Sequence, residues 1–251
     1  MKAIMLSYKT GIYLFLIFAS IKVSAQQLNM DVRDVDGNIR VYDPASANEK
    51  KLGSLAYADV LGSPFWDENW HPAIIYFNNG TKAKINQARL NLYTDEIHYI
   101  NSLGTELVVE NEGITKLVFL NKNNLTQPIA LFVKLTNHVT EAGTAFYRVL
   151  NTGLYQLLLL EKQFVKTGAY DPMQGKSVSS FYAKKNYAIY NEGKLTPLRD
   201  LDRSNILSAT PSNMMTTDWL KDKKTKLKTE KEVVDYLVIL NLSYAKIGEK
   251  Q

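Results

Sequence analysis

The sequence contains no cysteine, and only three of its 251 residues are histidines. Without cysteine no disulfide stabilises the fold, no thiol acts as a nucleophile, and no lipidated cysteine follows an export signal. A zinc site needs three or four ligands that converge. The nearest set combines Glu96 and His98, which share a strand face, with His71. This set is too small, so we expect no metal and no cofactor.

Recognisable catalytic motifs are missing too. The sequence has no Gly-x-Ser-x-Gly elbow. Gly175-Lys176-Ser177 resembles the end of a phosphate-binding loop, but Tyr170 stands where the first glycine is required. The adjacent carboxylates Asp67 and Glu68 point to opposite faces of a strand and make a poor acid–base pair. We therefore expect a protein that is not an enzyme.

Long apolar runs are absent except near the start of the chain. Lys2 and Lys9 precede the apolar residues 12–21, and Val23-Ser24-Ala25 resembles a cleavage site. This pattern predicts a signal peptide at residues 1–25, although an uncleaved anchor remains an alternative; the run is short for a membrane span. We expect an exported protein, mature from Gln26, in the periplasm, associated with the outer membrane or outside the cell.

Charge does not indicate a nucleic-acid partner. The formal net charge is +5, but three of the 30 basic residues lie in the leader, which leaves 27 against 25 acidic residues. Five lysines gather in residues 221–228. This run has two interpretations, a basic patch for anionic lipid or polysaccharide, or a solvated helix end and turn. The second is favoured because no aromatic residues are interleaved with the lysines.

Residues 63–109 read as short alternating runs separated by turn clusters at 78–81, 94–96 and 101–104. In residues 88–92 the apolar side chains fall on every second position, which places them on one face of a strand. The segment therefore predicts an antiparallel meander with one buried face.

Further strands follow the meander. We predict them at residues 114–120, 129–135, 144–150, 155–165 and 181–190. The run 155–165 is apolar at nearly every central position, which predicts a strand covered on both faces. Asn151-Thr152-Gly153 predicts a hairpin before it, and residues 168–180 read as a long polar loop. Near the start, Asp36-Gly37 in residues 31–43 predicts a hairpin rather than a calcium loop.

After residue 198 the apolar period changes to that of helices. We predict helices at residues 199–207, 212–221 and 229–244. The last begins with a Thr229–Glu232 capping box and has an apolar face through Val233, Tyr236 and Leu240.

The chain thus divides into a signal peptide (1–25), an antiparallel β domain (26–197) and a helical C-terminal segment packed on the sheet (198–251). The expected fold class is mainly β (α+β), a curved antiparallel meander or partly open barrel with a C-terminal helical segment. The physical reason is that so many one-sided strands must curl or stack to bury their apolar faces.

One stretch holds the candidate site residues Trp66, Asp67, Glu68, Trp70 and His71. Two tryptophans, two carboxylates and a histidine form a candidate aromatic and acidic ledge for ligand binding. The alternative is a pair of tryptophans that plug one end of the sheet. The alternative is favoured because large aromatic side chains more often supply burial than recognition.

Short motifs carry a resemblance over nearly the whole mature chain. They are Gly62-Ser63-Pro64-Phe65 with Trp70, residues 89–96, 147–153 and 181–184, and the C-terminal helices rich in Leu, Lys and Glu. With these motifs the chain resembles uncharacterised secreted β-meander proteins of Bacteroidota-type bacteria. The resemblance implies export from a Gram-negative cell, and it supplies no catalytic residue.

These observations lead to a functional hypothesis and two alternatives. The leading hypothesis is a non-enzymatic envelope or secreted protein with a binding or structural role, whose partner is an unknown protein or an apolar ligand. The alternative is a carrier that holds an apolar ligand in the concave side of the sheet, suggested by Phe132, Phe146, Tyr155 and Phe164. A hydrolase that uses Asp67 or His71 ranks third.

Overall fold

The computed structural model describes residues 41–42, 60–109, 112–137, 143–171 and 175–248. The predicted signal peptide and the predicted Asp36-Gly37 hairpin lie outside the described residues. Among the helices within them, none is long and apolar enough to cross a membrane.

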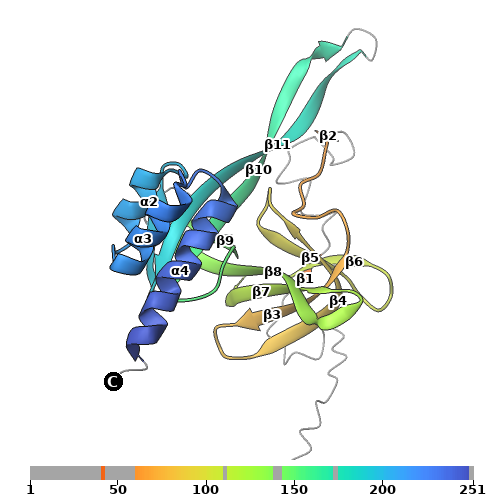
Figure 1. Cartoon of the computed structure of the whole chain (residues 1–251). Coiled ribbons are helices and arrows are strands. Elements are labelled where there is room, and N and C mark those ends of the chain that lie inside the picture. The colour runs from red at the N-terminus through yellow and green to blue at the C-terminus, as the bar shows by residue number, and fades with distance from the viewer. Residues whose placement is uncertain (1–40, 43–59, 110–111, 138–142, 172–174, 249–251) are drawn as a thin grey trace, which may run out of the picture.

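The chain is mainly β, as predicted, and one curved sheet organises it (Figure 1). The strands are β1 (Val41–Tyr42), β2 (Val60–Leu61), β3 (His71–Phe77), β4 (Lys82–Asn91), β5 (Glu96–Ile100), β6 (Glu106–Val109), β7 (Ile114–Asn121), β8 (Asn124–Asn137), β9 (Gly143–Val149), β10 (Tyr155–Asp171), β11 (Lys176–Asn191) and β12 (Lys194–Leu198). Their order is β1-β6-β5-β4-β3-β7-β8-β9-β10-β11-β12, and β2 lies off this path, parallel to β11.

The meander predicted at residues 63–109 is present as β3 to β6, and its turns have the chemistry that the sequence indicated. In the β3–β4 turn the Asn79 side chain accepts a hydrogen bond from the Thr81 amide at 3.0 Å, and Gly80 adopts a φ of 82°. In the β5–β6 turn the Asn101 side chain accepts from the amides of Leu103 and Thr105. These turns fix the register that buries one face.

That buried face forms the main core. Side chains from β3 to β9 make one cluster, and several, such as Ile75, Ile97 and Leu117, are completely buried. Because no second layer of described residues covers them, the sheet itself must curl around them. The curl brings β10 back to the β4–β5 turn, where the Gln163 amide donates to the Leu92 carbonyl at 3.1 Å. The expected fold class, a mainly β chain with a curved sheet, is confirmed; the sheet is open, and it is mixed because β2 runs parallel to β11.

The β10–β11 hairpin is much longer than predicted. Leu157 to Leu160 are buried, as expected for a strand covered on both faces. The polar loop predicted at 168–180 is wrong, because β10 continues to Asp171 and β11 begins at Lys176. Outside the sheet body a two-stranded ribbon meets solvent on both faces, so its residues carry no apolar alternation. The sequence also gave no sign of β12, an edge strand that contains Pro197.

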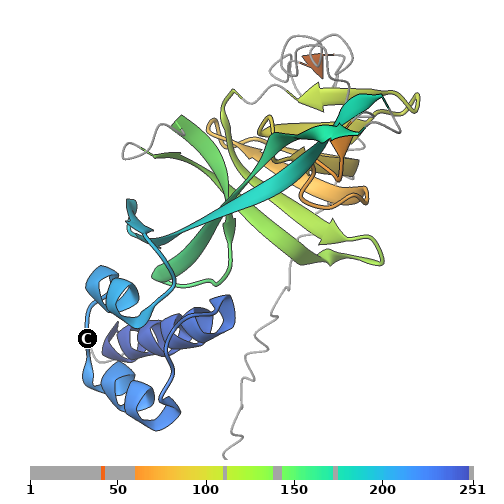
Figure 2. The same ribbon diagram turned by 90° about the horizontal axis from the view of Figure 1, so that it is seen from above.

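Three described helices follow the sheet, α2 (Arg203–Ala209), α3 (Met214–Lys223) and α4 (Glu230–Gly248). Figure 2 shows them grouped at one end of the molecule, away from β3 and β4. They bury Val233, Tyr236 and Leu240 against Leu157 and Ile189 of the hairpin. The predicted capping box is present.

The Asn241 side chain links α4 to the β9–β10 turn by hydrogen bonds. Asn241 accepts a hydrogen bond from the Tyr155 amide at 2.8 Å and donates to the carbonyls of Tyr155 and Thr152. Gly153 is required beside it, because its φ is 124° and an added Cβ would lie 2.3 Å from the Asn241 amide nitrogen.

Candidate functional site

In the structure, the five residues of the predicted ledge lie in different environments. Trp66 points into the core and stacks on Phe119, with ring centroids 5.1 Å apart, and it meets Phe132 edge-on at 5.5 Å. Its position agrees with the tryptophan plug rather than with a binding surface. Glu68 is exposed.

Asp67 and His71 form a pair at the rim of this core. His71 Nε2 and Asp67 Oδ2 lie 2.9 Å apart, and their side chains are 15% and 33% exposed. Burial raises the pKa of Asp67, but hydrogen bonds from Asn69 and His71 outweigh it, so the pKa lies below its usual value. A carboxylate that orients a histidine is part of many acid–base sites. Within the described residues, however, no hydroxyl group is hydrogen bonded to this histidine.

Trp70 lies over a different side chain, the guanidinium of Arg89. The Arg89 Cζ atom is 3.8 Å from the centroid of the Trp70 ring and 3.9 Å from that of Phe65, so the cation lies against both rings. The segment before β3 reaches this position because the Trp66 amide bonds to the Leu90 carbonyl, and the Leu92 amide bonds to the Pro64 carbonyl.

The same face holds a partly buried polar network that sequence reasoning missed. His98 Nδ1 lies 2.7 Å from Glu106 Oε1, and Arg89 Nη2 lies 3.3 Å from the same oxygen. The hydrogen bond to His98, helped by the nearby Arg89 guanidinium, lowers the pKa of Glu106 against the opposing effect of burial. Part of this network could have been found from the sequence, because Arg89 and His98 are directly paired in the register of β4 and β5.

This network has a structural role in the geometry observed. His98 is only 2% exposed at its side chain, and its second ring nitrogen faces buried Asn91 at 3.5 Å. Both ring nitrogens are therefore directed at protein groups. His71, beside Trp66 and Phe119, lies outside this hydrogen-bonded group. The described residues contain no group of three or more His, Asp or Glu side chains that is arranged to hold a metal ion.

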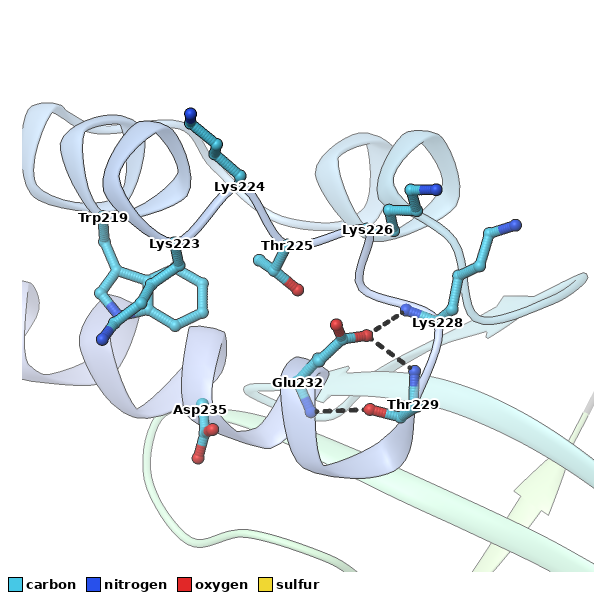
Figure 3. Close-up of a pocket in the computed structure, with 9 residues that line it drawn as sticks. All are labelled: Trp219, Lys223, Lys224, Thr225, Lys226, Lys228, Thr229, Glu232 and Asp235. Carbon is cyan, nitrogen blue, oxygen red and sulfur yellow. Dashed lines mark hydrogen bonds between the residues drawn. The ribbon is translucent and has the colours of Figure 1, made fainter.

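The lysine run at residues 221–228 borders a hollow of about 590 Å³ between α3 and α4 (Figure 3). Figure 3 shows the Lys224, Lys226 and Lys228 side chains directed outward from the hollow, and these lysines are exposed. Glu232 and Asp235 line the hollow, and Glu232 accepts hydrogen bonds from the amides of residues 228 and 229. This arrangement agrees with a solvated helix end and turn.

A cleft of about 350 Å³ lies between β9 and the β10–β12 strands. Apolar and aromatic side chains supply much of its wall, and polar groups stand at its edge: Tyr147, Leu160, Lys162, Phe164, Asn186, Tyr187, Ala188, Pro197, Leu198 and Arg199. Tyr187 donates a hydrogen bond to Glu230 of α4 at 2.8 Å. Burial, followed by this bond, raises the pKa of Tyr187 to about 12.

Beyond the cleft the β10–β11 hairpin projects from the sheet body as an arm, residues 162–171 with 175–186 (Figure 1). Phe164 and Tyr182 are cross-strand partners on it, with ring centroids 5.7 Å apart and exposures of 36% and 41%. The Lys184 ammonium lies 4.9 Å from the Phe164 ring centroid. Sequence reasoning placed Phe164 on the concave side of the sheet, and it considered Tyr182 only as part of the motif 181–184.

The base of the arm is held firmly. Lys162 forms an ion pair with Asp95 at 2.6 Å, and Phe181 meets Tyr93 edge-on at 5.8 Å. β2 pairs alongside residues 179 and 180. The exposed aromatic pair is thus presented by an anchored ribbon.

No protein-family model, curated protein or solved structure matches the chain.

Proposed function

We propose that this chain is an exported, non-enzymatic binding protein of the cell envelope that presents the β10–β11 arm to a partner. The observation that carries the proposal is the exposed Phe164–Tyr182 pair on the anchored arm. The burial of a large aromatic side chain contributes much favourable free energy. An exposed aromatic pair is therefore typical of a surface that binds another molecule. The aromatic residues of the predicted ledge are instead in contact with the protein itself.

The leader supports the location in this proposal. A charged n-region, a ten-residue apolar run and a small-residue site are typical of an export signal. The resemblance to secreted proteins of Bacteroidota-type bacteria supports the same compartment.

Site-specific photocrosslinking in the native cell tests the proposal. A Tyr182→benzoylphenylalanine variant should yield a crosslinked product in the envelope fraction. Tyr76, which lies on β3 in the sheet body, provides the matched position, and its equivalent variant should remain uncrosslinked. Retention of an intact leader in the cytoplasm, or equal crosslinking at both positions, would contradict the proposal.

The cleft beside β9 supports a second candidate function, a carrier of a small apolar ligand. Its volume of about 350 Å³ is at the lower end of the range typical of ligand pockets. The carrier predicted from the sequence relied partly on Phe132 and Phe146, but both belong to the filled core. Native mass spectrometry of the mature protein distinguishes the candidates, because a carrier retains a co-purified mass that a Leu160→Trp variant loses.

A further inference from the structure

We propose that the partner of the arm is the surface of a bilayer that contains anionic lipid, an inference that rests on the proposed binding function. Three exposed apolar side chains lie on one face of the arm and its flanking strand. Phe164 pairs directly with Tyr182, and Leu61 of β2 pairs with Ser180, two residues away on the same face. Leu61 is 63% exposed.

Lysines surround this apolar strip. Within residues 162–186 there are five lysines and one carboxylate, Asp171. Lys162 is paired with Asp95, but Lys166 and Lys184 are exposed and share the face of Phe164 and Tyr182, whereas Lys185 lies on the opposite face, in register with Glu161. Each lysine near a membrane that contains anionic lipid strengthens binding by about fivefold. The arm therefore has the charge that complements phosphate headgroups.

The kind of apolar side chain favours lipid over an acidic glycan. Flat aromatic rings stack well on sugars. An aliphatic side chain such as Leu61, by contrast, obtains most of its favourable binding free energy from contact with hydrocarbon. Aromatic side chains prefer the membrane interface, where their rings contact acyl chains. Lysine stems extend along apolar surface while their ammonium groups reach the headgroups. One face of the arm combines all three elements.

Flotation of the mature protein with lipid vesicles tests the inference. The protein should float with vesicles of phosphatidylcholine and phosphatidylglycerol, and only weakly with phosphatidylcholine alone. A Phe164→Ser/Tyr182→Ser variant should lose about tenfold in partition coefficient, because it removes most of the apolar contact. Lys166→Gln/Lys184→Gln should lose about 30-fold on anionic vesicles, and the loss should shrink in high salt.

A matched control is available on the sheet body. Lys116 lies 4.0 Å from the Tyr76 ring centroid on β3 and β7, so Tyr76→Ser/Lys116→Gln removes the same residue types far from the arm. This variant should float like the parent protein. The thermal unfolding midpoint of every variant is measured as well, so that a loss of binding to vesicles can be distinguished from a loss of folded protein.

The remaining outcomes separate the two proposals. If the parent protein does not float with anionic vesicles, but Tyr182→benzoylphenylalanine still crosslinks to an envelope protein, the binding function stands and the lipid inference is overturned. Binding to soluble alginate without binding to vesicles would also overturn it and assign the arm to an acidic glycan. Equal flotation of the parent and the Phe164→Ser/Tyr182→Ser variant would remove the arm from membrane binding.

Discussion

The curved body of the sheet and the β10–β11 arm use the same kinds of side chain in opposite ways. In the body, Trp66 and Phe119 stack on each other inside the core, and two rings cover the Arg89 cation. On the arm, Phe164 and Tyr182 lie beside each other as a tilted, exposed pair, with the exposed Lys184 next to them. The presence of aromatic and cationic residues therefore does not by itself indicate a binding site. Their exposure to solvent determines whether a partner can contact them.

The difference follows from how each region buries the apolar side chains of its strands. The body curls, so that its apolar face is covered by other parts of the same sheet, and the helices cover the apolar side chains at the start of the β10–β11 hairpin. The outer arm is a two-stranded ribbon, which has no opposite layer of its own. An apolar group on the arm is buried only when a partner supplies the second surface.

The largest expected contrast compares the same substitution in both regions. Phe119→Ala should lower the free energy of unfolding by about 3–5 kcal/mol, because it leaves a cavity under Trp66. Phe164→Ala should lower it by less, about 1–2 kcal/mol, because the side chain is 36% exposed and leaves no closed cavity. Urea denaturation of both variants measures the contrast. Equal losses would mean that the arm contributes to the core.

A second prediction concerns the turn that holds α4. Gly153→Ala should cost about 2–3 kcal/mol, since it combines a positive φ with a clash against Asn241. Gly104→Ala provides the control, because it shares a positive φ of 79° but meets no atom within 4 Å. It should cost about 1 kcal/mol. Comparable midpoints in thermal unfolding would show that Asn241 does not fix the turn.

The body was more predictable from sequence than the arm, and the physical reason lies in burial. One-sided burial in β3 to β8 imposes alternation, and asparagine and glycine turns mark the boundaries, so the meander and several later strands could be located. The outer arm is solvated on both faces and shows no such pattern. Residues 168–180 therefore resembled a loop, and the length of the hairpin was missed.

The candidate site was less predictable, because contacts between distant residues decide it. The sequence showed Trp66 and Trp70 close together, but their rings lie in different surroundings, one on Phe119 and the other on Arg89. Glu106 could not be linked to His98 without knowing that β5 and β6 bring them together. Tyr182 became a candidate only when the register paired it with Phe164.

A third prediction uses the pH dependence of the body. The folded-state pKa of Glu106 lies below its usual value. Its stabilising effect is therefore present above the unfolded-state pKa and is lost as pH falls through the folded-state value. Glu106→Gln should cost about 1–2 kcal/mol at neutral pH and should flatten stability in this acidic range.

Urea denaturation between neutral and acidic pH measures the effect. Glu68→Gln is the control, because Glu68 is exposed and makes no hydrogen bond or ion pair with the other residues that the structure describes. Its variant should keep the parent's pH profile. If the Glu106→Gln profile also matched the parent's, the His98 and Arg89 contacts would not stabilise the charged carboxylate.

The smallest expected effect is the coupling between the two exposed rings of the arm. Phe164 and Tyr182 are direct cross-strand partners, and such pairs contribute about 0.2–1 kcal/mol. A double-mutant cycle of Phe164→Ala and Tyr182→Ala, followed by urea denaturation, should give a coupling energy within that range. A coupling above about 2 kcal/mol would mean that the pair exists mainly to fold the hairpin. A small coupling would show that the two rings contribute little to the stability of the isolated fold. If the same variants also lose vesicle binding, the rings stabilise the bound state, where they become buried against the partner.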